Sequence, residues 1–157
     1  MKQLSILALV AAVLLAACAS GPPRRVSEPA ASIQQLTVDT DGNWSVQVRV
    51  QNYSSIAMRF DRLALELQVG GTAAGTLDAT PRVQVSQESA EVVTVELVPS
   101  AHAKLLLADA LAAGRGTAYL LEGTVSAAPV DRGSVRDYPI RREGALSPVP
   151  GLPGVLR

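Results

Sequence analysis

The sequence predicts an all-β domain, a β-sandwich or barrel, that includes one short helix. Over several segments apolar and polar residues alternate with a period of two, which is typical of strands with one buried face. Turn-forming residues separate these segments, so that short strands follow one another about every ten residues. One segment rich in Ala and Leu interrupts this pattern and has the composition of a helix.

The alternation is clearest in residues 44–51, where the apolar residues are Trp44, Val46, Val48 and Val50. The polar residues between them face the opposite side of the predicted strand. Trp44 opens this strand, and we interpret it as a core residue and not as a ligand contact. Further strands of the same kind are predicted at residues 63–69, 93–97 and 119–125, and weaker ones at residues 36–39, 75–79, 83–85 and 135–141.

Two tight turns and one helix connect these strands. Asp41-Gly42-Asn43 and Gly70-Gly71 each favour a hairpin, because Gly and Asn accept positive φ angles. The helix is predicted at residues 101–113, with Ser100 as its N-cap and Gly114 as the residue that ends it. We expect its apolar face to cover one open end of the sandwich. That face consists of Ala103, Leu107, Ala110 and Leu111.

The N-terminus predicts export and lipid attachment. A short, positively charged start precedes an apolar run over residues 4–15, which is too short to span a bilayer but suits a signal peptide. The run ends in Leu15-Ala16-Ala17-Cys18, which resembles the lipobox of bacterial lipoproteins, and Cys18 is the only cysteine of the chain. We therefore predict a signal peptide at residues 1–17 and acyl chains on Cys18 that anchor the protein to a membrane. The alternative is an ordinary secretory signal that is cut after Ala17.

Three further segments complete the predicted organisation. Residues 18–32 contain Pro, Gly and charge, a composition typical of an extended linker, and residues 33–145 form the predicted domain. Arg24 and Arg25 can touch anionic head groups, but a solvated linker is the simpler interpretation. Residues 146–157 are rich in Pro and Gly and are predicted to be a disordered tail. Residue 19 is Ala and not Asp, and by resemblance to the sorting rule of bacterial envelopes this predicts the outer membrane, facing the periplasm.

The composition of the chain narrows the classes of function. Lys plus Arg and Asp plus Glu number 14 each, so no excess of charge indicates nucleic acid as a partner. Aromatic residues make up 3%, which disfavours stacking surfaces for bases or sugars. One Cys and one His form neither an internal disulfide nor a Cys/His metal cluster. We therefore predict no metal and no cofactor.

No catalytic residue is predicted. A hydrolase of the Ser-His-Asp type would need His102 as its base, but His102 falls in the first turn of the predicted helix, where a solvated role is expected. The nucleophile-elbow and phosphate-loop motifs are absent from the sequence. Asp39 and Asp41 can ligate calcium, but two carboxylates without a third are more typical of turn formation. Glu88 and Glu91 are interpreted as a solvated loop edge.

Five segments occur in an order that is typical of a known family, at residues 46–52, 63–75, 81–85, 92–97 and 119–125. Together they resemble the water stress and hypersensitive response domain, the group-two late embryogenesis abundant family, over about residues 33–145. The Asn-Pro-Asn motif of that family is incomplete, because Asn52 is followed by Tyr53 and Ser54. The resemblance implies an immunoglobulin-like or fibronectin-like β-sandwich of about seven strands. It also implies a link to desiccation or other stress and no catalytic residues.

Two functions follow as hypotheses. The first is a non-enzymatic, lipid-anchored envelope protein that protects membranes or proteins when water is lost, and whose sheet edges can accept a partner strand. The alternative is a lipid-anchored binding or carrier module for a protein partner or an apolar ligand at the outer membrane. A cavity between the sheets would favour this alternative, although a dry core is the usual arrangement there. Its lining would be Leu65, Val48, Val95 and Leu121.

Overall fold

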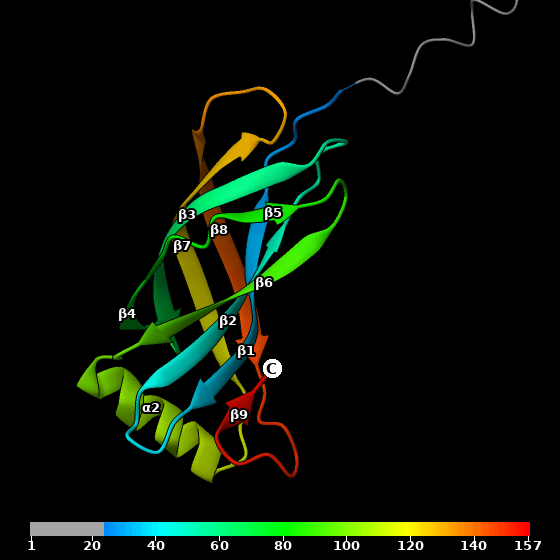
Figure 1. The fold of residues 1–157 in the computed structure, drawn as a ribbon. Helices are drawn as coiled ribbons and strands as arrows, with labels where there is room; N and C mark the ends of the chain where they lie inside the picture. The colour runs from blue at the N-terminus through cyan, green and yellow to red at the C-terminus, as the bar shows by residue number, and fades with distance from the viewer. Residues whose placement is uncertain (1–23) are drawn as a thin grey trace, which may run out of the picture.

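Two antiparallel sheets lie face to face in a computed structural model that describes residues 24–157 (Figure 1). The strands of the first sheet, in spatial order, are β6 (Ala90–Leu97), β2 (Trp44–Gln51), β1 (Ala30–Val38) and β9 (Val155–Leu156). Those of the second are β4 (Thr72–Ala79), β3 (Met58–Val69), β7 (Thr117–Pro129) and β8 (Arg136–Leu146), with β5 (Val83–Val85) paired to β3. One helix, α2 (Ala101–Ala112), connects β6 to β7. This arrangement confirms the predicted β-sandwich with one short helix.

The core lies between the two sheets and is formed by the alternating apolar residues. Along β2, Trp44, Val46, Val48 and Val50 are buried, while Arg49 between them is exposed. The same alternation places the apolar side chains of β3 and β7 against this face. Each large apolar side chain removed from water in this way contributes about 1.5–3 kcal/mol. The interpretation of Trp44 as a core residue is therefore confirmed.

The hairpin turns follow the predicted chemistry. Gly70 and Gly71, between β3 and β4, have φ angles of +56° and +76°, a pair of positive values that a type I′ turn requires. Between β1 and β2, Gly42 has a φ of +78°, and the Asp41 carboxylate accepts hydrogen bonds from the backbone N–H of Asn43 at 3.1 Å and from its side-chain amide at 2.7 Å. Asp41 is thus a turn-forming residue.

Helix α2 covers one end of the sandwich, as Figure 1 shows and as the sequence predicts. The Ser100 hydroxyl accepts the backbone N–H of Ala103 at 3.3 Å and donates to the carbonyl of Ala73 at 2.7 Å, so it both caps the helix and ties it to β4. Ala103, Leu107 and Ala110 are buried, and Leu111 is half-buried. Gly114 follows the helix with a φ of +62°.

Three boundaries differ from the predictions. Residues 146–157 are ordered: β9 pairs with Leu36 and Thr37 of β1, and Leu156 is fully buried. Apolar residues within the Pro- and Gly-rich tail supply this burial, so the prediction of a disordered tail is wrong. The described residues contain nine strands, more than the seven or so that the family resemblance implies. Eight of them correspond to the segments predicted from the sequence, and β9 is the addition. Finally, β1 begins at Ala30, so the predicted linker ends before residue 32.

The two ends of the sandwich are built differently. We call residues 24–29, 52–57, 86–89 and 130–135 the N-terminal end, because the described chain enters there. We call residues 39–43, 70–71, 101–116 and 147–154 the helix end. In Figure 1 the N-terminal end is at the top and the helix end at the bottom. Among the described residues, none of the helices has the length and apolar character needed to span a bilayer.

Candidate functional site

A single buried side chain organises the N-terminal end. Asn52 is 1% exposed, and its side-chain N–H groups donate to the carbonyls of Ile56 at 2.8 Å, Ser86 at 3.0 Å and Val85 at 3.2 Å. Its side-chain oxygen accepts the backbone N–H of Ser54 at 2.8 Å. A buried amide is stable only when its polar atoms are paired in this way. Asn52 therefore fixes the loop after β2 against the loop after β5.

Two serines of the same loop hold the segment that precedes β1. The Ser54 hydroxyl, which is fully buried, accepts the backbone N–H of Ser27 at 3.0 Å. The backbone N–H of Arg25 donates to the Ser55 hydroxyl at 2.8 Å, and the N–H of Ser55 donates to the Arg25 carbonyl at 3.0 Å. The described chain is thus tied to the domain from Arg25 onward.

The surface of the N-terminal end carries arginines and exposed apolar side chains. Arg24 and Asp131 are 3.8 Å apart, and Arg25 and Glu88 are 4.0 Å apart, with all four side chains more than half exposed. A surface depression of about 230 Å³ adjoins these pairs. It is lined by Val26, Pro129, Arg132, Gly133, Ser134, Arg136 and Tyr138. The end therefore presents guanidinium groups beside an apolar floor.

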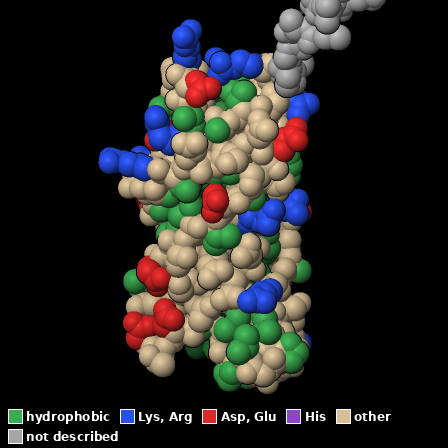
Figure 2. Space-filling model, turned by 45° about the vertical axis from the view of Figure 1, so that its right-hand side comes forward, with side chains coloured by type: hydrophobic (Ala, Val, Ile, Leu, Met, Phe, Trp, Pro, Cys, Tyr) green, Lys and Arg blue, Asp and Glu red, His purple; other side chains and the backbone are tan. Residues whose placement is uncertain are grey.

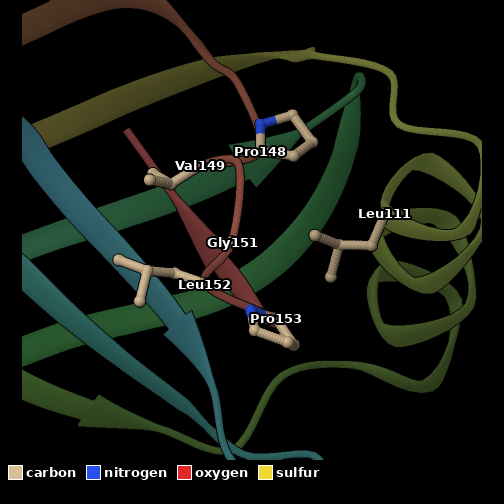
Figure 3. A pocket seen from close by; sticks show the side chains of 7 residues that line it. Leu111, Pro148, Val149, Gly151, Leu152 and Pro153 are labelled. Atoms are coloured by element: carbon tan, nitrogen blue, oxygen red, sulfur yellow. The ribbon is translucent and has the colours of Figure 1, made fainter.

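The helix end carries an open apolar cleft of about 420 Å³. Figure 3 shows the Leu111 side chain of α2 facing Pro148 and Pro153 across this cleft. The other lining residues are Val149, Gly151, Leu152 and Gly154. Backbone hydrogen bonds from Leu152 to Val149, at 3.1 Å, and from Val149 to Val155, at 2.9 Å, shape the loop that forms one wall. An apolar group is the ligand that such a lining would accept.

The sequence-predicted site residues fall into three groups. Leu15, Ala16, Ala17 and Cys18 lie outside the described residues, so acylation stays a prediction. His102 is exposed in the first turn of α2, and Glu88 and Glu91 are exposed as expected. Among residues 24–157 no three His, Cys, Asp or Glu side chains gather as metal ligands would. The four residues proposed to line an inter-sheet cavity belong instead to the core and are at most 6% exposed: Leu65, Val48, Val95 and Leu121.

Sequence reasoning missed the role of Asn52, although a signal was present. Asn52 continues the inward-facing parity of Trp44, Val46, Val48 and Val50, so the alternation itself places a polar side chain in the core. A buried amide at that position needs several partners, and the adjacent loops supply them. The cleft at the helix end was also missed, because its wall was interpreted as a disordered tail.

The fold and the contacts at its N-terminal end define a class: a two-layer antiparallel β-sandwich with a fixed N-terminal segment at one end and a helix over the other. The chain belongs to the late embryogenesis abundant protein family, because the model of that family matches residues 47–144, more than half of the chain.

Comparison with known proteins gives two structural neighbours. A solution structure of a protein from Arabidopsis thaliana is 14% identical, with a TM-score of 0.51, and the alignment covers 82% of this chain and 83% of the other. A crystal structure of a protein from Archaeoglobus fulgidus is 13% identical, with a TM-score of 0.44, and the alignment covers 80% of this chain and 98% of the other. No curated protein sequence matches. At these identities the Arabidopsis similarity concerns the fold alone.

Proposed function

We propose that the protein is a non-enzymatic lipoprotein of the bacterial envelope, whose late embryogenesis abundant domain protects membranes or proteins when water is lost. The observation that carries the proposal is the sequence Leu15-Ala16-Ala17-Cys18 placed ahead of a domain of this family. The lipid on Cys18 keeps the domain at a membrane, which by the resemblance at residue 19 is the outer membrane facing the periplasm. The family supplies the link to water stress.

The contacts at the N-terminal end support an anchor at this position. Arg25 and Ser27 are hydrogen-bonded to the domain, so a force on the preceding chain acts on a fixed point and not on a frayed strand. Arg25 is seven positions after Cys18, and a chain of that length reaches at most about 25 Å. The domain therefore stays close to the membrane that holds the lipid.

The anchor is tested by mass spectrometry of the N-terminal peptide and by incorporation of labelled palmitate in cells. We expect acyl chains on Cys18 in the wild-type protein and none in Cys18→Ser, which should be released from washed membranes. An unmodified Cys18 in the mature wild-type protein would overturn the anchor.

The protective role is tested by drying. The acylated protein in vesicles is dried together with a labile enzyme, and activity and retention of a trapped dye are measured after rehydration. We expect better recovery than with an equal mass of an unrelated lipoprotein of similar size in the same vesicles. Equal recovery with the two proteins would overturn the protective role and leave the anchor intact.

A second function is favoured by the cleft at the helix end, which suits a lipid-anchored binding module for an apolar ligand or an apolar segment of a partner protein. Leu152 lines this cleft, whereas Leu105 is 71% exposed on α2 and does not line it. Native mass spectrometry of the purified protein should show a co-purified apolar ligand that Leu152→Asp loses and Leu105→Asp retains. A ligand-free mass for the wild-type protein would count against this function.

A further inference from the structure

We infer that the N-terminal end docks directly on the surface of an anionic phospholipid bilayer, so that the helix end and its cleft point away from the membrane. This inference rests on the proposed lipid anchor and adds an orientation to it. The alternative is a domain that tumbles freely on its tether. Three features of the N-terminal end favour docking: the length of the tether, the arginines and the exposed apolar side chains.

The tether holds the N-terminal end close to the lipid surface. Cys18 is six residues before Arg24, the first described residue, and six residues span at most about 20 Å. The field of an anionic membrane falls off over about 8 Å at physiological ionic strength, so charges at this end repeatedly enter it. Because the anchor already confines the domain, a weak surface attraction is enough to orient it.

Three arginines of this end, and Arg136 directly after it at the start of β8, are available to lipid phosphates. Arg24 and Arg25 pair with Asp131 and Glu88 only at 3.8 and 4.0 Å, and exposed pairs of this kind contribute little to stability. Among the described residues, Arg132 and Arg136 form no ion pair. A guanidinium group matches phosphate oxygens with two parallel hydrogen bonds, so exchanging a loose carboxylate partner for a phosphate is favourable.

The acidic groups of this end set the limit of the attraction. Within the N-terminal end Glu28, Glu88 and Asp131 equal Arg24, Arg25 and Arg132 in number, and Arg136 is followed by Asp137. The end has no net charge, so docking depends on the arginines exchanging loose carboxylate partners for lipid phosphates. In Figure 2 most of the Lys and Arg side chains in view lie on the half of the molecule that contains the N-terminal end, with some Asp and Glu among them, and hydrophobic side chains gather at the opposite end. The attraction between these arginines and an anionic surface should be lost at high salt.

Exposed apolar side chains lie beside the arginines. Val26 is 44% exposed, Tyr53 46% and Val135 51%, and they come from three different segments of the N-terminal end. A tyrosine with one polar and one apolar part suits the head-group layer, and aliphatic side chains gain by leaving water there. Arginine and apolar groups together are the combination that binds an anionic bilayer surface.

The test uses the full acylated protein in vesicles and a single fluorescent label. The only native cysteine is Cys18, and once it is acylated, Val135→Cys introduces the only free thiol. Leu105→Cys at the helix end is the control, since Leu105 is exposed on α2 and does not line the cleft. Each variant carries a polarity-sensitive dye and is placed in vesicles of phosphatidylcholine alone or with phosphatidylglycerol.

We expect the dye at position 135 to shift to shorter wavelengths and to resist iodide quenching in the anionic vesicles. The dye at position 105 should behave alike in both kinds of vesicle. Arg132→Gln with Arg136→Gln should weaken docking roughly 30-fold, taking about fivefold for each arginine near an anionic surface. Lys104→Gln with Arg115→Gln removes the same charge from the helix end and should leave docking unchanged.

Each other outcome has a distinct meaning. If the protein floats with the vesicles but the dye at position 135 does not respond, docking is overturned and the anchor stands. If the dye responds equally with and without phosphatidylglycerol, the anionic surface is not the partner and the inference fails. The inference also fails if the response of the dye persists in the variant that lacks Arg132 and Arg136. If mass spectrometry finds no lipid on Cys18, the anchor and the orientation that depends on it both fail.

Discussion

The two ends of the sandwich are stabilised by different kinds of interaction. At the N-terminal end the loops are held by hydrogen bonds to one buried amide, that of Asn52, and to the Ser54 and Ser55 hydroxyls. At the helix end, Leu107 and its buried neighbours on α2 pack on the core, and the C-terminal loop contacts the helix across an apolar cleft. Polar pairing therefore holds the first end, and burial of apolar surface holds the second.

This difference follows from what each end contains. Loops expose backbone N–H and C=O groups that must be paired when they are buried, and a side-chain amide with two donors and an acceptor meets several of them at once. A helix pairs its own backbone internally, so it needs only an apolar face to close the sandwich. The end at which the described chain begins is thus the one with fixed loops, and the opposite end carries the apolar surface.

The largest effect is expected from Asn52→Ala. The change leaves the carbonyls of Ile56, Val85 and Ser86 and the N–H of Ser54 without their side-chain partner. Each buried group left unpaired costs about 1–3 kcal/mol, but water can form hydrogen bonds with some of these groups. We therefore expect a loss of about 4 kcal/mol in the free energy of unfolding. Urea unfolding measures this loss.

Tyr53→Ala is the matched control for Asn52, because Tyr53 lies in the same loop and its side chain is 46% exposed. We expect a change within about 0.5 kcal/mol for this variant. A loss at Asn52 no larger than that at Tyr53 would show that the amide does not organise the N-terminal end.

The next effect belongs to the helix end. Leu107 is 1% exposed in the contact between α2 and the sheets, and Leu107→Ala should cost about 3 kcal/mol in unfolding free energy through lost burial and a cavity. Leu105, 71% exposed on the same helix, provides the control, and its replacement by Ala should change stability by less than about 0.5 kcal/mol. Equal losses at the two positions would mean that α2 does not close the sandwich by apolar packing.

The regular parts of both sheets could be predicted from the sequence. The period of two in residues 44–51 fixed which face of β2 is buried, and Ser100 and Gly114 fixed the limits of α2 to within about a residue. These features depend on local patterns, and local patterns are readable in a single sequence. The fold class, the helix and its position over one end are accordingly confirmed.

The parts that could not be predicted depend on contacts between distant residues. Residues 146–157 have the composition of a flexible tail, but their order comes from pairing of Thr37 with Val155 and of Leu36 with Leu156, more than a hundred positions apart. The partners of Asn52 are likewise supplied by loops that composition alone does not bring together. The acylation of Cys18 is also predicted from a local sequence pattern, and it stays a prediction because residues 1–23 are not described.

The C-terminal strand gives a third prediction, smaller than the first two. Leu156 is fully buried beside β1, and Leu156→Ala should cost about 2 kcal/mol, because a two-residue strand at the chain end can relax around the lost volume. Hydrogen exchange should show protection of the Arg157 amide, which donates to the Ser147 carbonyl at 2.9 Å. Rapid exchange of this amide in the wild-type protein, together with an unchanged unfolding free energy in Leu156→Ala, would show that the tail is disordered in solution.

The smallest effect is expected at an exposed ion pair between the two ends. Arg62 of β3 donates to the Asp78 carboxylate of β4 at 2.7 Å, and this hydrogen bond holds the pKa of Asp78 below its ordinary value. Because the pKa is lower in the folded state, the pair stabilises the protein at pH values above the ordinary carboxyl pKa, and this contribution is lost as the pH falls through the folded-state pKa. Arg62→Gln should therefore raise the pKa of Asp78 toward its ordinary value, as measured by NMR titration of the carboxyl carbon. It should lower stability slightly at neutral pH and not in strong acid.

Arg59→Gln removes a neighbouring arginine that pairs with Asp61 instead, so the pKa of Asp78 should stay low in that variant. An unchanged Asp78 titration in Arg62→Gln would mean that this surface pair does not persist in solution, leaving the two ends and the core between them to account for the stability of the domain.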